Sequence, residues 1–402
     1  MPPVRVLSLD QVATVLNRVD AEDVLVSQAA AFHAYRSVNT QATFMPSRID
    51  TLTSAIKIVS IPVTDSKNGL PGVTVVMDND SGEPKGLVNA RLLTAIRTAA
   101  GSALATRIIF LTRHLAQSHG KAHAENDSNT HLKQDVEGAV GGKPLTLVIF
   151  GSGAQAKAHI QLLVHVLPDQ IQKVIVCNRT LPRAKALLHE LRSDSRYARI
   201  DLEVFSTSDG DSFKLLANST ETQKQQQTEE VVHSTNPQLQ LKDIVASADI
   251  ICTCTNSREA LFKGEWVKPG THLNMVGSFK PDMHEVDQTL IRRAMILVDA
   301  TKECQEEAGE LMLAMKETGS DGILDELGRL FDPKGNLLPE AIPTSFMDLP
   351  LSASSDSTST ETQNQKDVTI FKSVGIAAQD VAITALVLDM AEAMNIGSLV
   401  EF

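Results

Sequence analysis

Apolar runs of strand length alternate with helical patterns through the middle of the chain. Residues 145–150 form a continuous apolar run, and residues 157–166 then carry apolar side chains at helical spacing. Further strands are expected at 173–177, 202–205, 249–255, 272–276 and 295–299, and further helices at 184–191 and 241–248. Strands that alternate with helices are typical of a parallel sheet with crossover helices. The pattern therefore predicts an α/β fold with a central Rossmann-like, doubly wound domain over residues 143–322.

The two ends of the chain predict a second domain. The N-terminal part holds short β-rich pieces at 55–61 and 74–77 and a helical pattern at 93–109. The C-terminal part holds one long helical pattern at 374–394, with apolar residues at near-helical spacing. Helices and strands must bury their apolar faces against one another in a shared core. We therefore expect the two ends to form a single α+β domain from residues 1–142 and 323–402.

Three polar segments interrupt these patterns. Residues 114–142, 206–238 and 351–366 are rich in Ser, Thr, Asn, Gln and charged residues, which predicts surface insertions. The first segment contains four histidines at irregular spacing, without a framework of carboxylates or cysteines: His114, His119, His123 and His131. A solvated loop explains them better than a metal site, and we expect no bound metal.

Composition narrows the class of partner. The chain has 402 residues, which favours two domains, and its balance of 42% hydrophobic and only 4% aromatic residues is typical of α/β proteins. The net charge of −12 argues against nucleic acid and anionic membranes, because both would repel the protein. We expect no signal peptide and no bilayer-spanning run, and the four cysteines suit a reducing compartment, the cytoplasm. A small soluble ligand is the expected partner.

A glycine-rich turn follows the first strand of the central domain. Residues 151–156 read Gly151, Ser152, Gly153, Ala154, Gln155 and Ala156, and a helical pattern follows directly. In this setting Gly151 permits a tight turn, Gly153 lets the backbone approach a pyrophosphate, and Ala156 lets helix and strand pack closely. The helix N-terminus would offer free N–H groups to the phosphates. The turn predicts a dinucleotide-binding site, although glycine turns also serve packing alone.

The end of the second strand bears on which dinucleotide binds. A carboxylate at this place would accept hydrogen bonds from the adenosine ribose and repel a 2′-phosphate. The chain instead has Asn178, Arg179 and Thr180. The arginine supplies a positively charged guanidinium group that can bind a phosphate, and the other two supply neutral polar groups. NADPH is therefore favoured over NADH, and the alternative is an exposed arginine on a surface turn.

Several motifs resemble the ornithine cyclodeaminase and mu-crystallin family. These are FKGEWVKPG at residues 262–270, HLNMVGS at 272–278 with Pro281 and Asp282, RTAAGSA at 97–103 and FKSVG at 371–375. The resemblance covers nearly everything except the three insertions. It implies a central Rossmann domain, a substrate and dimerisation domain made from both chain ends, a nicotinamide in the cleft between them, and a homodimer.

The resemblance also implies roles for individual residues. It places Arg97 and Thr98 near the cofactor phosphates and substrate, and three residues along the cofactor cleft, which are Thr255, Val276 and Ser278. Ser373 would close that cleft. Arg48, Lys57 and Arg97 match positions that hold a substrate carboxylate, as arginine can do with two parallel hydrogen bonds. Lys57 lies in an apolar, β-prone run, so without the resemblance an exposed strand lysine would be the preferred interpretation.

The implied activity is reduction of a cyclic ketimine carboxylate by NADPH. Two alternatives remain open, an ornithine cyclodeaminase with bound NAD and a non-enzymatic protein that binds a small ligand. The family's cyclodeaminases place an Asp where this chain has Phe279, which disfavours the first alternative, although Asp282 could substitute. Cys252 and Cys254 share one face of a strand, which indicates core packing.

A cluster of glutamates further along the chain has two interpretations. Glu306, Glu307 and Glu310 follow the spacing of a solvated helical face. The resemblance brings this stretch toward the ligand cleft, so a functional role for Glu307 remains a weaker hypothesis.

Overall fold

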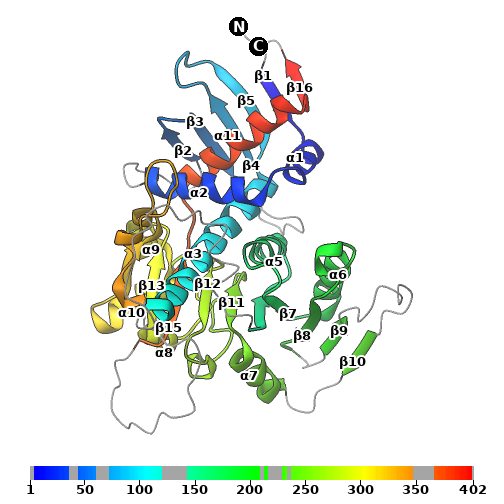
Figure 1. Ribbon diagram of the computed structural model, residues 1–402, viewed down its shortest axis with the longest axis vertical. Helices are drawn as coiled ribbons and strands as arrows, with labels where there is room; N and C mark the ends of the chain where they lie inside the picture. The colour runs from blue at the N-terminus through cyan, green and yellow to red at the C-terminus, as the bar shows by residue number, and fades with distance from the viewer. Residues whose placement is uncertain are drawn as a thin grey trace.

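The computed structural model describes residues 4–35, 44–59, 72–119, 143–208, 212–215, 229–232, 237–346 and 366–400. These residues form two sheets at opposite ends of the molecule, and the long helix α3 (Arg91–His119) runs from one to the other (Figure 1). The alternation of apolar strands and helices thus gives the expected α/β architecture with two domains.

The larger sheet has ten described strands. Its order is β10 (Glu229–Val232), β9 (Ser212–Leu215), β8 (Asp201–Ser206), β7 (Ile171–Asn178), β6 (Leu145–Phe150), β11 (Ile250–Thr253), β12 (His272–Met275), β15 (Val368–Lys372), β13 (Ala294–Val298) and β14 (Ile323–Glu326). All pairs from β8 to β14 are parallel, whereas β9 and β10 add antiparallel strands at one edge. The chain order reverses between β6 and β11, as in a doubly wound fold.

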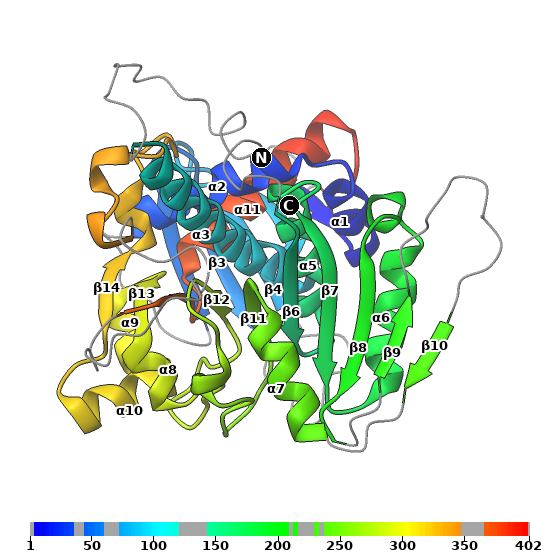
Figure 2. The ribbon, with the colours of Figure 1, turned by 60° about the horizontal axis from the view of Figure 1, so that its bottom comes forward.

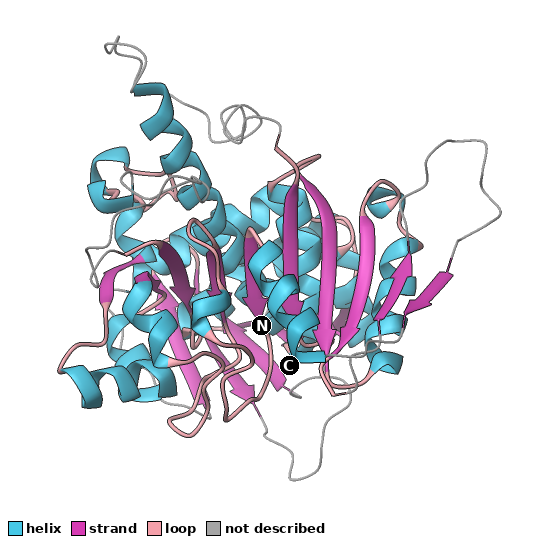
Figure 3. Ribbon diagram, turned by 90° about the horizontal axis from the view of Figure 1, so that it is seen from below, coloured by secondary structure: helices cyan, strands magenta, loops and turns pink. Residues whose placement is uncertain are grey.

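Helices cover both faces of this sheet (Figures 2 and 3). Leu147 and Ile149 of β6 join the core cluster with α3, α5 (Ala154–Val166) and α6 (Leu181–Arg192). Val148 and Phe150 point the other way, into a second cluster. That cluster contains residues of α7 (Pro237–Ser247), α8 (Gln288–Arg293), α9 (Thr301–Glu307) and α10 (Gly309–Thr318). Because successive strand residues alternate in direction, one apolar run serves both layers.

The smaller sheet is built from both chain ends. Its order is β16 (Ser398–Val400), β1 (Val4–Leu7), β5 (Pro84–Asn89), β4 (Gly72–Met77), β3 (Thr53–Val59) and β2 (Phe44–Ile49). Helix α11 (Ala377–Ala393) lies across one face, with α1 (Leu9–Leu16) and α2 (Ala21–Tyr35) beside it. The first and last strands pair antiparallel, which brings the two termini together (Figure 1). Short 3-10 helices complete the fold at Ser195–Tyr197, Gly264–Trp266, Leu327–Leu330, Pro339–Ala341 and Thr344–Phe346.

The central sheet extends further along the chain than residue 322. Strands β14 and β15 both lie in the ten-stranded sheet, although the sequence pattern assigned residues 323–402 to the other domain. Every residue of β15 is buried between β12 and β13, so this apolar run satisfies its backbone groups in the larger sheet. In the sequence, the polar segment at 351–366 separates β15 from the earlier strands of the larger sheet. The sequence pattern therefore did not show that β15 belongs to that sheet.

Helix α3 corrects the expectation that no stretch is long and apolar enough to cross a membrane. Residues Arg91–Arg113 pass that test by length and composition, but 83% of the apolar window is buried inside the protein. The apolarity is explained by packing, since α3 contacts α5 on one side and α2 and α11 on others.

The predicted insertions are only partly described. Helix α3 continues to His119, and residues 120–142 lie outside the described residues, as do 347–365. The segment 206–238 contributes strands β9 and β10, and the rest of it, apart from residues 206–208 and the start of α7, is outside the described part.

Candidate active site

The glycine turn after β6 has the geometry of a phosphate-binding turn. Gly151 has a φ of 108°, and a Cβ there would lie 2.7 Å from the carbonyl oxygen of Cys254, so only glycine fits. Gly153 directly precedes α5, and a Cβ added to it would meet nothing within 4 Å. No side chain caps this helix, so its first N–H groups stay available to an anion, while Ala156 is fully buried against the sheet.

The turn lies where the strand order reverses, which is where doubly wound folds bind ligands outside the carboxyl ends of their strands. The ends of β7 and β8 lie on one side of it, and the ends of β11, β12, β15 and β13 lie on the other. We call the region beside these strand ends the crevice, and we name its two sides the adenosine half and the nicotinamide half after the groups that the sequence predicts there.

The adenosine half presents a neutral and positive surface. The Asn178 side chain donates to the Thr180 carbonyl at 2.8 Å, and the Ser206 hydroxyl donates to the Arg179 carbonyl at 3.1 Å. Arg179 and Thr180 are exposed, and Thr180 precedes α6 without capping it by its side chain. Within the described residues no carboxylate forms an ion pair with the Arg179 guanidinium, so no neighbouring side chain neutralises its charge.

Helix α3 is held beside the turn by a buried histidine. His159 of α5 is fully buried, which lowers its pKa to about 4, so the ring is neutral. Nδ1 lies 2.7 Å from the Gln155 carbonyl and must donate to it, which leaves Nε2 to accept from the Ser102 hydroxyl at 2.9 Å. The Thr98 hydroxyl donates to the Thr94 carbonyl at 2.8 Å on the same helix. Arg97 and Thr98 are thereby fixed next to the turn.

A buried glutamate ties together the strand ends of the nicotinamide half. Glu285 is fully buried, and one of its oxygens accepts from the Thr255 backbone and hydroxyl at 2.8 and 2.7 Å. The other oxygen accepts from the Thr253 hydroxyl at 2.7 Å and the Gly277 backbone at 2.8 Å. Burial raises the pKa of Glu285, while Lys372 and the threonine hydroxyls act in the opposite direction. Val276, beside Gly277, is nearly buried.

A lysine and a second glutamate support the next loop. Lys372 is fully buried, and its ammonium donates to the Ser278 carbonyl at 2.6 Å and lies 3.3 Å from Glu310. The Ser278 hydroxyl lies 2.5 Å from the other Glu310 oxygen. Glu310 is fully buried, so the solvated helical face predicted for it is wrong, because α10 turns this position toward the strand ends.

The segment after β15 is anchored by Asp299. One oxygen of this buried carboxylate accepts from the Ser373 hydroxyl at 2.7 Å and from the backbones of Val374 and Gly375 at 3.0 and 2.7 Å. The other oxygen accepts from the Ala300 backbone at 2.9 Å. Three successive donors on one carboxylate define a rigid turn at the carboxyl edge of the sheet.

Two buried cations lie at the boundary between the domains. The ammonium of Lys57 on β3 is 2.9 Å from Asp380 of α11, and the Arg97 guanidinium reaches the same oxygen at 3.5 Å. All three side chains are at most 6% exposed. Burial lowers the pKa of Lys57, and Asp380 opposes this effect. Two positive groups thus share one carboxylate, which leaves the cluster with a net positive charge.

Arg97 also connects this cluster to the segment held by Asp299. Gly375 has a φ of 92°, and a Cβ there would lie 2.5 Å from Arg97 Nη1, so the guanidinium rests on this glycine. Gln379 accepts from Arg97 Nη1 at 3.1 Å and donates to the Arg97 carbonyl at 3.2 Å. The side chain and the backbone of Arg97 are therefore fixed by the same amide.

Arg48 does not join these cations. Lys57 pairs in register with Met45, so Arg48, three positions further along β2, points to the opposite face of the sheet. Its side chain is 57% exposed and pairs with Asp50 at 2.8 Å. The predicted clamp of three cations is therefore reduced to Lys57 and Arg97 in this structure.

Other candidate residues lie at the edge of the site or outside it. Phe279 is half-buried under the Lys280 ammonium, and Asp282 pairs with Arg258 at 3.0 Å on the surface. Glu307 is half-buried, and burial raises its pKa. Cys252 is buried in the strand, as the core interpretation predicted. No group of three or more metal-ligating side chains occurs in the described part of the chain, and the side chains of the four histidines at 114–131 lie outside it.

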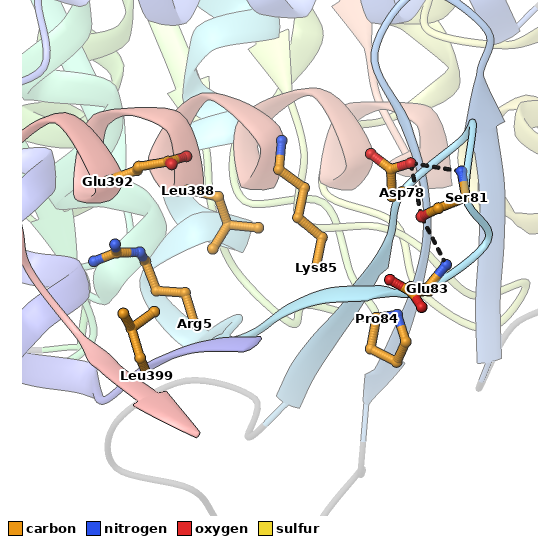
Figure 4. Close-up of a pocket in the computed structure, with 9 residues that line it drawn as sticks. All are labelled: Arg5, Asp78, Ser81, Glu83, Pro84, Lys85, Leu388, Glu392 and Leu399. Atoms are coloured by element: carbon orange, nitrogen blue, oxygen red, sulfur yellow. Dashed lines mark hydrogen bonds between the residues drawn. The ribbon is translucent and has the colours of Figure 1, made fainter. Parts of the chain in front are cut away.

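A surface pocket of about 550 Å³ lies elsewhere, on the smaller domain (Figure 4). It is lined by residues of β1, the β4–β5 hairpin, α11 and β16, among them Arg5, Lys85, Leu388 and Glu392. Arg5 donates a hydrogen bond to the Ala391 carbonyl at 3.4 Å, and Lys85 forms an ion pair with Asp389 at 3.1 Å. Because its cations are already bonded and it lies apart from the crevice, it is not the candidate active site.

Sequence reasoning missed the carboxylates that shape the site. Asp380 interrupts an otherwise apolar helical pattern, and Asp299 stands at the end of a predicted strand, so both carried a signal. Glu285 stands in a loop segment with no periodic pattern, so its burial could not be inferred from the sequence.

Fold and site together define a Rossmann-type dinucleotide-binding protein with a second domain over the carboxyl edge of its sheet. The model of the ornithine cyclodeaminase/mu-crystallin family matches residues 8–121 and 216–395, and the chain belongs to this family.

Similar proteins span nearly the whole chain. A delta(1)-pyrroline-2-carboxylate reductase of Bacillus cereus is 26% identical over 404 residues, which cover 98% of this chain and 94% of the relative. The ketimine reductase mu-crystallin of Rattus norvegicus is 24% identical, covering 85% of this chain and 76% of its own. The structure of Thermococcus litoralis delta(1)-pyrroline-2-carboxylate reductase in complex with NADH and L-proline has a TM-score of 0.64 at 19% identity, covering 99% of this chain and 100% of that one.

The buried ion cluster generates a stability prediction. Replacing Asp380 by Asn leaves Lys57 and Arg97 without their carboxylate, so the free energy of unfolding should fall by about 3 kcal/mol. Asp389 lies on the same helix as Asp380 and forms an exposed ion pair with Lys85. Asp389→Asn should therefore lower the free energy of unfolding by less than about 1 kcal/mol. Urea unfolding of both variants makes the comparison.

A second substitution separates charge from packing. Adding Lys57→Met to the Asp380→Asn protein should restore part of the lost stability, because it removes one uncompensated ammonium. Similar small losses for Asp380→Asn and Asp389→Asn would contradict the paired-charge interpretation.

Proposed function

We propose that this protein is an NADPH-dependent reductase of cyclic ketimine carboxylates. One observation carries the proposal: Lys57 and Arg97 are buried beside the nicotinamide half of the crevice and share a single carboxylate, Asp380. Such a net positive site favours a small anionic substrate. The names of the relatives, which include a pyrroline-2-carboxylate reductase and a ketimine reductase, support the same substrate class.

The residues of the crevice fit a nicotinamide dinucleotide. The pyrophosphate would bind at the turn formed by Gly151, Gly153, Ala154, Gln155 and Ala156, where a Cβ on Gly153 would meet only open space. Arg179, with Asn178 and Thr180, would hold a 2′-phosphate. Thr98 would lie near the phosphates, and the nicotinamide half would be lined by Thr255, Val276, Ser278 and Ser373. When bound, the reduced cofactor supplies a hydride.

The protein's own residues would mainly orient the substrate. Arg97 and Lys57 would bind the carboxylate and hold the adjacent C=N carbon toward the nicotinamide half. Arg97 can do so reproducibly because Gln379 and Gly375 fix its guanidinium. A protonated imine is already electrophilic, so the site needs orientation and exclusion of water more than a strong base.

The two alternatives have less support. An ornithine cyclodeaminase would need a carboxylate near position 279, but Phe279 stands there and Asp282 is engaged with Arg258 at the surface. A non-enzymatic ligand-binding protein would use the same crevice and differs only in lacking turnover. Residues 1–142 with the C-terminal helix and strand β16 would form the substrate and dimerisation domain, and the cytoplasm remains the expected compartment.

We also propose a homodimer formed through the smaller sheet. Ile56, Val75, Leu87 and Val6 form one apolar row across four strands, on the face opposite α11. Leu87 is 38% exposed, and Phe44 near the end of the same face is 55% exposed. An apolar sheet face of this kind is typical of a protein interface.

The function is tested by following NADPH absorbance with five- and six-membered cyclic ketimine carboxylates. We expect NADPH oxidation, at least a hundredfold slower turnover of the same ring without its carboxylate, and a similar loss in Arg97→Met with the complete substrate. On the ring without a carboxylate, Arg97→Met and the unsubstituted protein should differ little.

Each alternative has its own result. Proline and ammonia from ornithine with NAD, without imine reduction, would replace the proposal by the cyclodeaminase. Tight NADPH binding without turnover of any imine would favour the binding protein.

Cofactor preference depends on Arg179. Arg179→Asp should weaken NADPH binding at least tenfold and NADH binding much less, because only NADPH carries the phosphate that the arginine would hold. Fluorescence titration gives both dissociation constants. Arg18→Asp, the same charge change on the exposed turn after α1, is the control, and equal losses for both cofactors in Arg179→Asp would refute the assignment.

Oligomeric state tests the sheet face. Leu87→Asp should convert a dimer into a monomer in light scattering, because it places a charge in the centre of the apolar row. Leu313→Asp on α10 makes the same change at a position of similar exposure, 36%, and should leave the dimer intact. A dimeric Leu87→Asp protein would rule out this interface.

A further inference from the structure

The buried charges beneath the nicotinamide half do not cancel. Glu285, Glu310 and Asp299 are each at most 1% exposed, and Lys372 is the single buried ammonium among them. Lys372 pairs with Glu310 at 3.3 Å. Neither Glu285 nor Asp299 forms an ion pair with any other described residue, so two carboxylates remain without a paired cation.

Both carboxylates accept hydrogen bonds on both oxygens, and donors of this kind favour the charged form of a carboxyl group. Each oxygen of Glu285 accepts a backbone N–H, from Thr255 at 2.8 Å and from Gly277 at 2.8 Å. Each oxygen of Asp299 also accepts one, from Ala300 at 2.9 Å and from Gly375 at 2.7 Å. Each backbone N–H can only donate, so these contacts are strongest when the carboxyl group carries its negative charge.

The position of these two groups gives the charge a consequence. Glu285 bonds to the loops that end β11 and β12, and Asp299 bonds to the turn that ends β15. These strand ends form the floor of the nicotinamide half. A bound reduced cofactor would supply a hydride to the carbon of a protonated imine, so the nicotinamide ring would become positively charged while the product amine is neutral.

We propose that Glu285 and Asp299 stabilise the oxidised, positively charged nicotinamide and so make the bound reduced cofactor a stronger hydride donor. The inference rests on the proposed function, because it requires a nicotinamide cofactor in the crevice. The two residues act through space and not by contact, which makes them electrostatic positioning residues.

The experiment measures dissociation constants for NADP⁺ and NADPH, without turnover. Glu285→Gln and Asp299→Asn should each raise the ratio of the NADP⁺ constant to the NADPH constant about tenfold, as expected for one charge acting across roughly 10 Å at an effective dielectric constant near 20. A tenfold change in this ratio corresponds to ~30 mV in the two-electron potential of the bound cofactor.

Thr253→Val is the matched control. It removes a buried hydrogen bond to Glu285 and keeps the negative charge, so the ratio should stay at the value of the unsubstituted protein. A shift in Thr253→Val as large as in Glu285→Gln would mean that loop packing, and not charge, sets the ratio.

The unsubstituted protein supplies a measurement that needs no variant. It should bind NADP⁺ at least as tightly as NADPH, and NADP⁺ binding more than tenfold weaker would overturn the inference even if neither charge variant folds. Unchanged ratios in folded Glu285→Gln and Asp299→Asn would overturn it as well. Failure to bind any nicotinamide dinucleotide would instead refute the proposed function.

Discussion

The contact between Arg97 and Gly375 is the constraint on which the site depends. The guanidinium can rest on this segment only because residue 375 has no side chain and a φ of 92°. Asp299 fixes the segment from below, and Gln379 and Asp380 fix the arginine from the side. One side chain thus joins the carboxyl edge of the central sheet to α11 of the smaller domain, and the position of each domain's polar groups depends on the other.

The site combines two electrostatic environments of opposite sign. On the side of the smaller domain, Lys57 and Arg97 share the single carboxylate of Asp380. At the ends of the central strands, the three buried carboxylates Glu285, Asp299 and Glu310 outnumber the one buried ammonium, Lys372, which pairs with Glu310. An anionic substrate and a ring that becomes cationic would each meet the favourable sign. Burial matters on both sides, because charges removed from water act over longer distances than surface charges do.

Most of the fold followed from the sequence, because strand and helix periods are local properties. The apolar run at 145–150 and the glycine turn predicted β6, the start of α5 and the crevice correctly. Strand β15 was assigned to the wrong domain, since the pairing partner of a short apolar run is not encoded locally. The prediction that Arg48 binds the substrate carboxylate was wrong for a related reason. The face of the sheet on which Arg48 lies depends on the register between β2 and β3, and a motif match does not specify this register. Glu285 and Glu310 were missed because burial of a carboxylate depends on donors from distant segments.

The pairing of the last segments with the first ones has a consequence for synthesis on the ribosome. Strand β15 fills the place between β12 and β13, and β16 completes the sheet that begins with β1. Neither sheet can therefore close until its late strand, β15 or β16, has been synthesised, and the nascent chain must carry unpaired strand edges until then. Folding of each domain therefore depends on a segment that is synthesised late, and loss of residues 368–400 would leave both sheets incomplete.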